Sequence, residues 1–357
     1  MPDSATCRSA SRIVPYRIGG VHASGGVMEA TVQVGRGSGD SDALTLHWNV
    51  PFLVDLRRAL DVHSRGPRDP TYRIDESGAI WRTSLTPQGP ATLRLARARP
   101  PARPAAAGPA GGAVTGVSAA AWGPGAAWMI ATLPDLLGAR DDPAGFTPVH
   151  PALRDLLRQH PGLRIGRSCR VLEALVPAVL EQKVVGLEAH RAWRLLLRWH
   201  GLPAPGPAPA GMLVFPPAAT WRVIPSWDWH RAGVEAVRTR TIACAAAVAG
   251  RLEEVCVLPS AEADRRLRSL PGIGPWTSAE VRQRACGDAD AVSVGDYHLP
   301  AVVGWALAGR PTDDVGMLDL LAPYAGQRYR ATRLIELGGR FPPRRAPRMP
   351  VRDYRAM

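Results

Sequence analysis

The chain has 357 residues, and its 44 Lys and Arg residues outnumber its 31 Asp and Glu residues, for a formal net charge of +13. This surplus favours a polyanionic partner such as nucleic acid or an anionic membrane surface. No apolar run reaches the roughly 18 residues that a membrane-spanning helix needs. The five cysteines show no metal-ligand spacing and are scattered along the chain. We therefore expect a cytoplasmic protein that spans no membrane and binds no metal.

The first 121 residues predict a small α+β domain behind a disordered start. Residues 1–40 are rich in Gly and Ser and lack the apolar segment of a secretory signal, so we expect mostly disorder there. Within 41–121, the stretch ALTLHWNVPF alternates apolar and polar side chains, which indicates a strand. Helical spacing follows over 53–64, and three short strands are indicated within 71–98. The Pro- and Ala-rich stretch 99–116 is typical of a low-complexity loop.

The chain from 122 to 340 has the apolar spacing of helices. Pro or Gly marks the breaks between the helical segments. The predicted helices are 126–138, 150–159, 169–185, 187–200, 233–250, 261–270, 275–286, 297–308, 315–323 and 328–338. The Arg-rich segment 341–357 has little to bury and predicts a flexible basic tail. The expected fold is mainly α with an α+β N-terminal domain.

The string LPGIGPWT at 270–277 predicts a tight turn between two helices. Gly272 and Gly274 can adopt positive φ without a Cβ clash. Pro275 suits the first turn of a helix because its missing N–H would be unpaired there. Such a turn leaves backbone N–H groups open at a helix N-terminus, where a phosphate can bind without recognition of any base. The alternative is an ordinary helix–turn–helix connection with a glycine cap.

A single carboxylate, Asp296, follows this turn in GDADAVSVGDYHLP. An Asp before a helix can cap it by accepting hydrogen bonds from the first free N–H groups. A fixed carboxylate can also stabilise positive charge that builds up on a sugar, and it can orient an attacking water. The two roles are compatible, since the cap would hold the carboxylate in place.

The turn and the carboxylate together resemble the DNA-3-methyladenine glycosylase II family of the helix–hairpin–helix DNA glycosylase superfamily. In that family PGIG-x-WT precedes DDYL by the same spacing. The resemblance implies a helix–hairpin–helix element at 262–286, with Asp296 as the catalytic aspartate. It also implies a base pocket that contains Trp276 and Tyr297. Glu280 stands where the family has a pocket tyrosine.

The same resemblance implies a set of DNA contacts. Gly272, Ile273, Gly274 and Thr277 would contact the backbone of the DNA. Gln182, in VLEALVPAVLEQKVVG, would lie near the wedge that replaces an extruded base. An exposed helix glutamine is the alternative for Gln182. The implied partner is double-stranded DNA that contains damaged bases, bound by a monomer.

Bifunctional members of the superfamily use a lysine just after the hairpin to form a Schiff base. Trp276 occupies that position here, and the only lysine of the sequence, Lys183, lies in another predicted helix. Members with an iron–sulfur cluster need four C-terminal cysteines, and none follows Cys286. The resemblance therefore implies a monofunctional base-excision-repair enzyme that removes alkylated purines of the 3-methyladenine type without a cofactor.

Other functions remain open from the sequence. Glu280 leaves room for a glycosylase that acts on oxidised or deaminated bases. A non-catalytic helix–hairpin–helix protein could use the hairpin only to bind DNA, although such a protein would have no need of Asp296. A basic structural or membrane-surface protein is less supported, because no amphipathic basic helix is evident. Trp221, Trp227 and Trp229 form a cluster that favours core packing over base or DNA contact.

Overall fold

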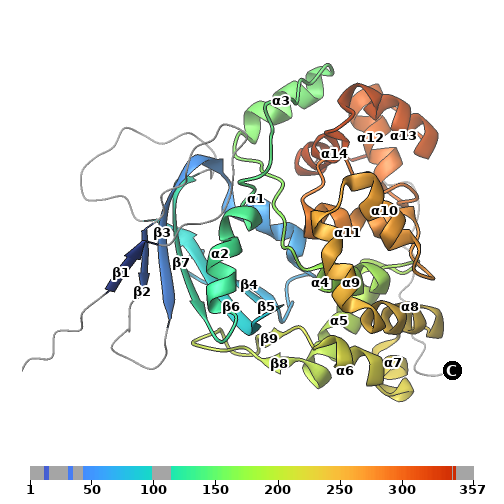
Figure 1. Cartoon of the computed structure of the whole chain (residues 1–357). Helices are drawn as coiled ribbons and strands as arrows, with labels where there is room; N and C mark the ends of the chain where they lie inside the picture. The colour runs from blue at the N-terminus through green and yellow to red at the C-terminus, as the bar shows by residue number, and fades with distance from the viewer. Residues whose placement is uncertain (1–11, 16–30, 35–42, 99–113, 340, 343–357) are drawn as a thin grey trace, which may run out of the picture.

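The computed structural model describes residues 12–15, 31–34, 43–98, 114–339 and 341–342. Most of the predicted disordered start, the loop 99–113 and the tail beyond 342 lie outside this part of the chain. Figure 1 shows a sheet on the left, a larger helical part on the right, and helix α2 (Ala126–Leu136) against one face of the sheet. This arrangement confirms the predicted fold class, mainly α with an α+β N-terminal domain.

The N-terminal domain is built on an antiparallel sheet that has seven strands among the described residues. Their spatial order is β1-β2-β3-β7-β6-β5-β4, and every neighbouring pair is antiparallel. The strands are β1 (Arg12–Pro15), β2 (Thr31–Val34), β3 (Leu44–Val54), β4 (Tyr72–Ile74), β5 (Ile80–Thr86), β6 (Gly89–Arg97) and β7 (Val114–Trp122).

One face of this sheet forms the core of the domain. Buried and exposed side chains alternate along the first half of β3, which confirms the predicted strand, and Leu46 and Trp48 are almost fully buried. These side chains belong to one apolar cluster with Leu93 of β6 and with Leu133 of α2. The alternation in β3 therefore decides which face of the sheet receives α2.

Three strands of the large sheet differ from the sequence predictions. β7 begins inside the segment expected to be a loop, and its Ala-rich sequence lacks most of the β-branched residues that favour strands. It is nevertheless paired with β3 on one side and β6 on the other, so tertiary pairing overrides a weak local preference. β1 and β2 extend the sheet beyond β3, within a region predicted to be mostly disordered.

Each predicted helix has a counterpart, although α4 ends five residues early. The further helices are α1 (Leu56–Leu60), α3 (Pro151–Gln159), α4 (Val171–Leu180), α5 (Gly186–His200), α6 (Ala218–Val223), α7 (Ser226–Ala232), α8 (Ala236–Ala247), α9 (Ala249–Glu253), α10 (Ser260–Arg268), α11 (Pro275–Val281), α12 (Leu299–Ala308), α13 (Asp314–Leu321) and α14 (Arg328–Leu337). Short turns of helix lie at η1 (Asp61–His63), η2 (Glu254–Val257), η3 (Arg282–Cys286) and η4 (Ala322–Tyr324). A small hairpin pairs β8 (Leu202–Pro203) with β9 (Leu213–Val214).

The helices surround two separate apolar cores. The first joins α4, α5, α7 and α8, with Leu175 and Trp193 near its centre. The second joins α3, α12, α13 and α14, with Val303 and Leu334 fully buried. The helical part therefore has two lobes, and residues from both lobes and from the sheet domain meet at the candidate site.

The tryptophan cluster divides between the interior and the surface. Trp221 and Trp229 are buried, with ring centroids 5.9 Å apart. The prediction of core packing is confirmed for these two residues. Trp227 lies on α7, not in an extended segment, and 66% of its surface is exposed. Core packing is therefore wrong for Trp227.

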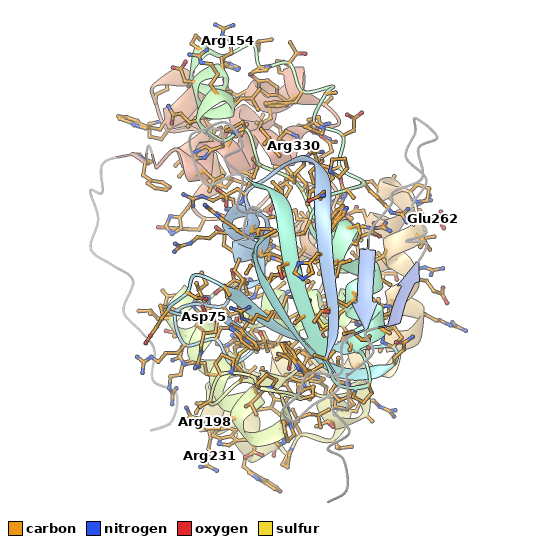
Figure 2. The ribbon with its side chains drawn as sticks, turned by 90° about the vertical axis from the view of Figure 1, so that its left-hand side faces the viewer. Asp75, Arg154, Arg198, Arg231, Glu262 and Arg330 are labelled. Carbon is orange, nitrogen blue, oxygen red and sulfur yellow. The ribbon has the colours of Figure 1, made fainter. Side chains whose placement is uncertain are left out.

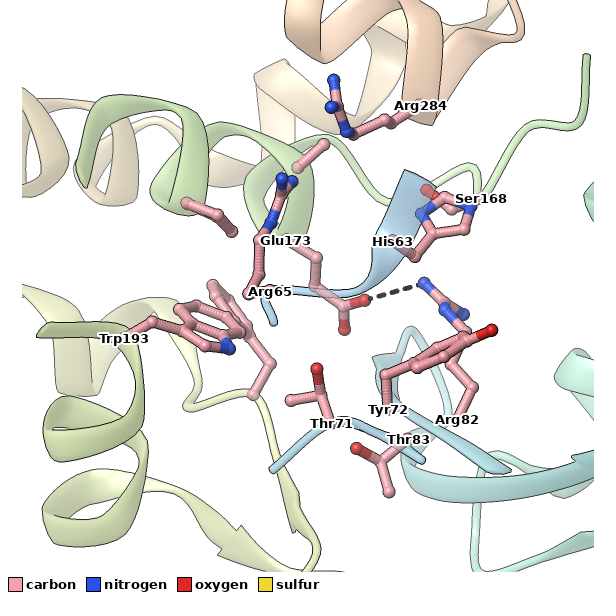
Figure 3. A pocket seen from close by; sticks show the side chains of 13 residues that line it. His63, Arg65, Thr71, Tyr72, Arg82, Thr83, Ser168, Glu173, Trp193 and Arg284 are labelled. Atoms are coloured by element: carbon pink, nitrogen blue, oxygen red, sulfur yellow. Dashed lines mark hydrogen bonds and ion pairs between the residues drawn. The ribbon is translucent and has the colours of Figure 1, made fainter. Parts of the chain in front are cut away.

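The two domains meet through buried polar side chains. Glu173, in the first turn of α4, accepts hydrogen bonds from Ser84 Oγ at 2.9 Å and from the backbone N–H of Leu85 at 2.6 Å. It also pairs with Arg82 of β5 at 3.4 Å, and Figure 3 shows this contact as a dashed line. Both side chains of that pair are at most 10% exposed. A single helical carboxylate therefore holds three groups of the sheet domain.

A small closed chamber lies beside this contact (Figure 3). Its volume is about 30 Å³, enough for a water molecule. Its walls include His63, Arg65, Arg82, Glu173 and Arg284. Burial, together with the charges of Arg82, Arg284 and Arg65, holds the pKa of His63 well below its usual range. His63 is therefore neutral at physiological pH.

Much of the positive charge lies on the molecular surface. Arg154 projects from one end of the molecule and Arg198 and Arg231 from the other, whereas Arg330 lies in the interior (Figure 2). Arg330 pairs there with the buried carboxylate of Asp141. Within the described ranges, no helix is long and apolar enough to cross a membrane.

Candidate DNA-lesion site

The LPGIGPWT string forms the turn between α10 and α11. Gly272 has a φ of +85°, and a Cβ atom there would lie 2.1 Å from Thr241 Oγ1, so this position requires glycine on two counts. Gly274 has a φ of −92°, and its Cβ position faces open space. The expectation of positive φ at both glycines is therefore right for Gly272 and wrong for Gly274.

The larger side chains of this turn point into the protein. Ile273 is 6% exposed and Thr277 is 2% exposed. Thr277 Oγ1 accepts a hydrogen bond from Gln182 Nε2 at 2.8 Å. A ligand that approached the hairpin would therefore meet backbone and glycine rather than the side chains of Ile273 or Thr277.

Gln182 braces the hairpin from the end of α4. Its Nε2 donates to the Gly272 carbonyl oxygen at 2.9 Å and to Thr277 Oγ1 at 2.8 Å. These bonds hold the side chain against the hairpin, so the alternative of an exposed helix glutamine is wrong. The expected place of Gln182 near the wedge stays a prediction. The next residue, Lys183, has a left-handed φ of +55° and is exposed. The tip of this turn therefore presents Lys183 rather than Gln182.

Asp296 is held by three hydrogen bonds from N–H donors. Its Oδ1 accepts from the backbone N–H groups of His298 at 2.7 Å and Leu299 at 2.8 Å, at the start of α12. Its Oδ2 accepts from the indole Nε1 of Trp276 at 3.0 Å. Charged acceptors make the stronger bonds to N–H donors, so these three bonds hold the carboxylate firmly in one orientation. The capping geometry expected from the sequence is present, and it also fixes the plane of the indole.

An open cavity of about 570 Å³ lies next to this carboxylate. Three residues singled out in the sequence, Trp276, Glu280 and Asp296, line it together. The other walls come from the 61–65 segment of the N-terminal domain and from α14. We call this space the open cavity. It lies where the sheet domain and both helical lobes meet.

A π-helical turn directs further side chains toward the open cavity. α11 continues into the π turn Arg282–Cys286 without a break. Within it, Gln283 Nε2 donates to Ser293 Oγ at 3.0 Å, and Arg284 Nε donates to the Val62 carbonyl oxygen of the N-terminal domain at 2.9 Å. Arg284 lines both the open cavity and the closed chamber. π turns often occur at functional sites, because the extra residue re-aims the neighbouring side chains.

Glu280 is fully engaged with its neighbours. Its Oε1 accepts from Ser293 Oγ at 2.6 Å, and its Oε2 pairs with Arg284 Nη1 at 2.7 Å. Burial lowers the pKa of Arg284, but the interactions with Glu280, Tyr329 and Glu181 together outweigh it and leave that pKa raised. The position that resembles the family's pocket tyrosine therefore carries a neutralised ion pair.

No sequence pattern indicated four other residues of the open cavity. These residues are Asp61, Tyr329, Arg333 and Glu336. Arg333 pairs with Asp61 of the N-terminal domain and lies 3.4 Å from Glu336. Tyr329, Arg333 and Glu336 follow helical spacing on one face of α14, which was predicted as a helix but had no motif that linked it to Asp296.

Tyr297, expected in the pocket, lies outside it. Its side chain is absent from the lining of the open cavity, and 86% of the residue is exposed. Its ring meets the His298 ring edge-on, with centroids 4.8 Å apart. Asp296 takes the inward position because its carboxylate caps α12, and this turns the neighbouring side chain outward.

The fold of this chain matches those of solved DNA glycosylase structures. Over 82% of this chain and 98% of the other, the fold matches a 3-methyladenine DNA glycosylase from Archaeoglobus fulgidus with a TM-score of 0.63 and 16% identity. An 8-oxoguanine glycosylase/lyase from Clostridium acetobutylicum, in complex with DNA, matches over 84% and 96% with a TM-score of 0.62 and 12% identity. The chain has the helix–hairpin–helix DNA glycosylase fold. At these identities the likeness concerns the fold alone.

Curated sequences narrow the resemblance within this fold. No family model matches the chain. In two strains of Mycobacterium tuberculosis, a "probable bifunctional transcriptional activator/DNA repair enzyme AlkA" is 33% identical over 153 residues. That alignment covers 42% of this chain and 30% of the relative. The predicted resemblance to the DNA-3-methyladenine glycosylase II family is confirmed by this match.

Proposed function

We propose that this chain is a monofunctional DNA glycosylase that removes alkylated purines, chiefly of the 3-methyladenine type, from double-stranded DNA. The main support is the position of Asp296. Its carboxylate is fixed by three N–H donors and lines an open cavity beside a helix–hairpin–helix element. A protein that only binds DNA has no need of such a carboxylate.

The chemistry assigned to Asp296 is electrostatic. As the bond between C1′ and the base breaks, the electron pair leaves with the base and positive charge develops on the sugar. A carboxylate that is already oriented stabilises that charge without reorganisation. The same group accepts a proton from the water that attacks C1′. The products are a free base and an abasic site, which other base-excision-repair enzymes would process.

Trp276 is assigned to base binding. Its N–H is committed to Asp296 and its ring lines the open cavity. An extruded base that stacked on this ring would present its sugar to the neighbouring carboxylate. An indole face also attracts a cation, and many alkylated purines carry positive charge. Such bases leave readily, so a strong general acid is unnecessary.

The hairpin is assigned to the DNA backbone. The turn exposes backbone at Gly272 and Gly274, and the space in front of Gly274 is open. A phosphate could approach the N–H groups at the start of α11 there, without reading any base. Net charge of +13 would add salt-dependent attraction. We expect a monomer that acts on chromosomal DNA in the cytoplasm.

A second candidate substrate class follows from the polar lining of the open cavity. The hydroxyl of Ser293 and the ion pair of Glu280 with Arg284 could hydrogen-bond to oxidised or deaminated bases. These bases are neutral, whereas 3-methyladenine and 7-methylguanine in DNA are positively charged. A panel of lesions can therefore separate the two classes.

The test uses duplexes with one defined lesion each, followed by hot alkali to cut abasic sites. The panel contains 3-methyladenine, 7-methylguanine, hypoxanthine, uracil and 8-oxoguanine. We expect release of the methylated purines. Asp296→Asn should reduce the rate by roughly 10²–10³-fold, with equal or tighter DNA binding because a negative charge is lost.

Two outcomes would count against the proposal. Release of 8-oxoguanine or uracil alone would support the second substrate class. Excision by Asp296→Asn at nearly the wild-type rate would remove the assigned role of the carboxylate. Circular dichroism of the variant would confirm that its fold is retained.

A further inference from the structure

The open cavity contains more negative than positive groups. Among the described residues that line it, five carboxylates face three guanidinium groups. Arg65 pairs with Glu181 at 3.3 Å and Arg284 pairs with Glu280 at 2.7 Å. The third guanidinium, of Arg333, pairs with Asp61. Two carboxylates, Asp296 and Glu336, therefore remain without an arginine of their own.

Glu336 differs from the other carboxylates in its surroundings. Its one ion-pair contact is with Arg333 Nη1 at 3.4 Å, and Arg333 already serves Asp61. Its side chain is 45% exposed, whereas those of Glu181 and Glu280 are 18% and 13% exposed. Glu336 thus offers a carboxylate to the cavity that no other group fully neutralises.

The electrostatic environment of Glu336 supports this reading. Although part of its side chain is open to the cavity, the group lies deep among protein atoms, and this burial raises the pKa of its carboxyl. Arg333 lowers that pKa and the charge of Glu280 raises it. Burial and the charge of Glu280 both raise the pKa of Glu336, and a cation placed in the cavity would oppose both effects.

Tyr329 lies on the same face of α14 and provides a contrast. Its ring is buried and lines the open cavity. Burial raises the pKa of Tyr329 to about 12, so the hydroxyl stays neutral at physiological pH. It can donate to or accept from a charged or a neutral base alike. The Tyr329 hydroxyl would therefore hydrogen-bond to a polar base of either charge, whereas the Glu336 carboxylate would favour a cationic base.

We propose that Glu336 selects positively charged, N-alkylated purines by supplying the counter-charge that this cavity otherwise lacks. This inference rests on the proposed glycosylase function. A cationic base that filled the cavity would pair with Glu336 and displace water from the pair, which makes the attraction stronger than in bulk solvent. A neutral base would desolvate the same carboxylate without compensation. The cavity would therefore favour cationic bases by attraction and disfavour neutral bases by the cost of desolvating Glu336.

The test compares one cationic and one neutral purine in the same duplex sequence. Single-turnover release of 7-methylguanine and of hypoxanthine is measured at pH 7.5 for the wild type, Glu336→Gln and Tyr329→Phe. Glu254→Gln is the control, because Glu254 is an exposed carboxylate that pairs with Arg266 on the surface, away from the cavity. Thermal unfolding of each variant checks the fold.

Glu336→Gln should reduce 7-methylguanine release roughly tenfold, the size expected when a hydrogen bond to a charged group is lost. Hypoxanthine release should stay constant or rise, so the ratio of the two rates falls. Tyr329→Phe should lower both rates and leave their ratio within about twofold of the wild type. Glu254→Gln should change neither rate.

The outcomes separate this inference from the proposed function. If Glu336→Gln lowers both rates by the same factor, or neither rate, charge selection by Glu336 is refuted while the glycosylase function stands. If the wild type releases hypoxanthine but no methylated purine, charge selection is also refuted. If the wild type releases no damaged base of any kind, the proposed function fails and the inference fails with it.

Discussion

The closed chamber and the open cavity share two lining residues but differ in whether their carboxylates are paired. Arg65 and Arg284 line both spaces, and both spaces lie where the N-terminal domain meets the helices. The chamber has a volume of about 30 Å³, whereas the cavity has about 570 Å³. In the chamber, Glu173 meets three groups of the opposite domain. In the cavity, Asp296 and Glu336 have no arginine of their own.

This difference distinguishes a structural from a functional group of charges. A buried ion pair whose acceptors are all satisfied fixes the relative position of two segments, and its loss leaves an uncompensated charge. Surplus carboxylates in a hollow cost stability, so such a cluster is a sign of a ligand-binding site. Carboxylates and arginines therefore hold the two domains together in the closed chamber, whereas in the open cavity the surplus carboxylates are available to a ligand.

The largest effect on stability should come from removing the Glu173 carboxylate beside the closed chamber. Glu173→Ala would leave buried Arg82 unpaired and remove the acceptor for Ser84 and Leu85. We expect a loss of about 3–5 kcal/mol in the free energy of unfolding, measured by urea denaturation. Glu254→Ala, which removes a surface carboxylate, should cost less than about 1 kcal/mol. Equal losses for the two variants would contradict the structural role of Glu173.

A smaller effect should appear at the hairpin next to the cavity. Gly274→Val places a side chain in open space at a φ that valine tolerates, so folding should be unaffected. Binding to damaged and undamaged duplex should weaken alike, by about 1–3 kcal/mol, because backbone contacts to a charged phosphate are blocked. Gly250→Val in α9 is a matched control, since that glycine also faces open space without positive φ. Unchanged affinity of a folded Gly274→Val protein would rule out the hairpin as the phosphate contact.

The closed chamber should also make stability depend on pH through His63. Its pKa is lowered in the folded protein, so below about pH 6.5 the unfolded chain binds a proton that the folded protein does not. Stability should therefore fall as pH falls, by up to about 1.4 kcal/mol per pH unit from this group. Urea denaturation at pH 7.5, 6.5 and 5.5 would measure it, and His63→Gln should show a shallower slope. Parallel slopes for the two proteins would mean that His63 titrates normally.

The last prediction is that no covalent protein–DNA adduct forms in the open cavity. No lysine lines it among the described residues, and Trp276 occupies the place of a lyase's amine. Borohydride added during reaction with a lesion duplex should give no covalent adduct, while a bifunctional glycosylase run in parallel should give one. An adduct in the wild type that disappears in Lys183→Ala would show that the exposed turn supplies an amine after all.

Local patterns predicted β3 and the longer helices, and the family resemblance added three residues of the candidate site. Alternation in β3, helical spacing and the Gly-x-Gly string are short-range signals, and each corresponds to an observed element. Asp296, Trp276 and Glu280 line one cavity because they come from adjacent segments of one motif. β7 was missed because cross-strand pairing, not its own sequence, makes it a strand.

The remaining walls of the cavity could not be predicted from local patterns. Asp61 and Glu336 are far apart in the sequence and reach the cavity only after the two domains and both helical lobes pack together. Gln182 was expected near the wedge, but its bonds to Gly272 and Thr277 could not be predicted because they depend on the relative position of two helices. Tyr297 was misplaced because its orientation follows from the cap formed by Asp296.

The π turn Arg282–Cys286 makes this site sensitive to chain length as well as to side-chain identity. A π turn contains one residue more than the α-helical turn it replaces. Deleting one residue there would restore an ordinary α-helical turn, which would re-aim Gln283 and Arg284 while leaving Trp276 and Glu280 of α11 in place. A single insertion or deletion in this turn would therefore reshape the open cavity while every other residue of its lining stays unchanged.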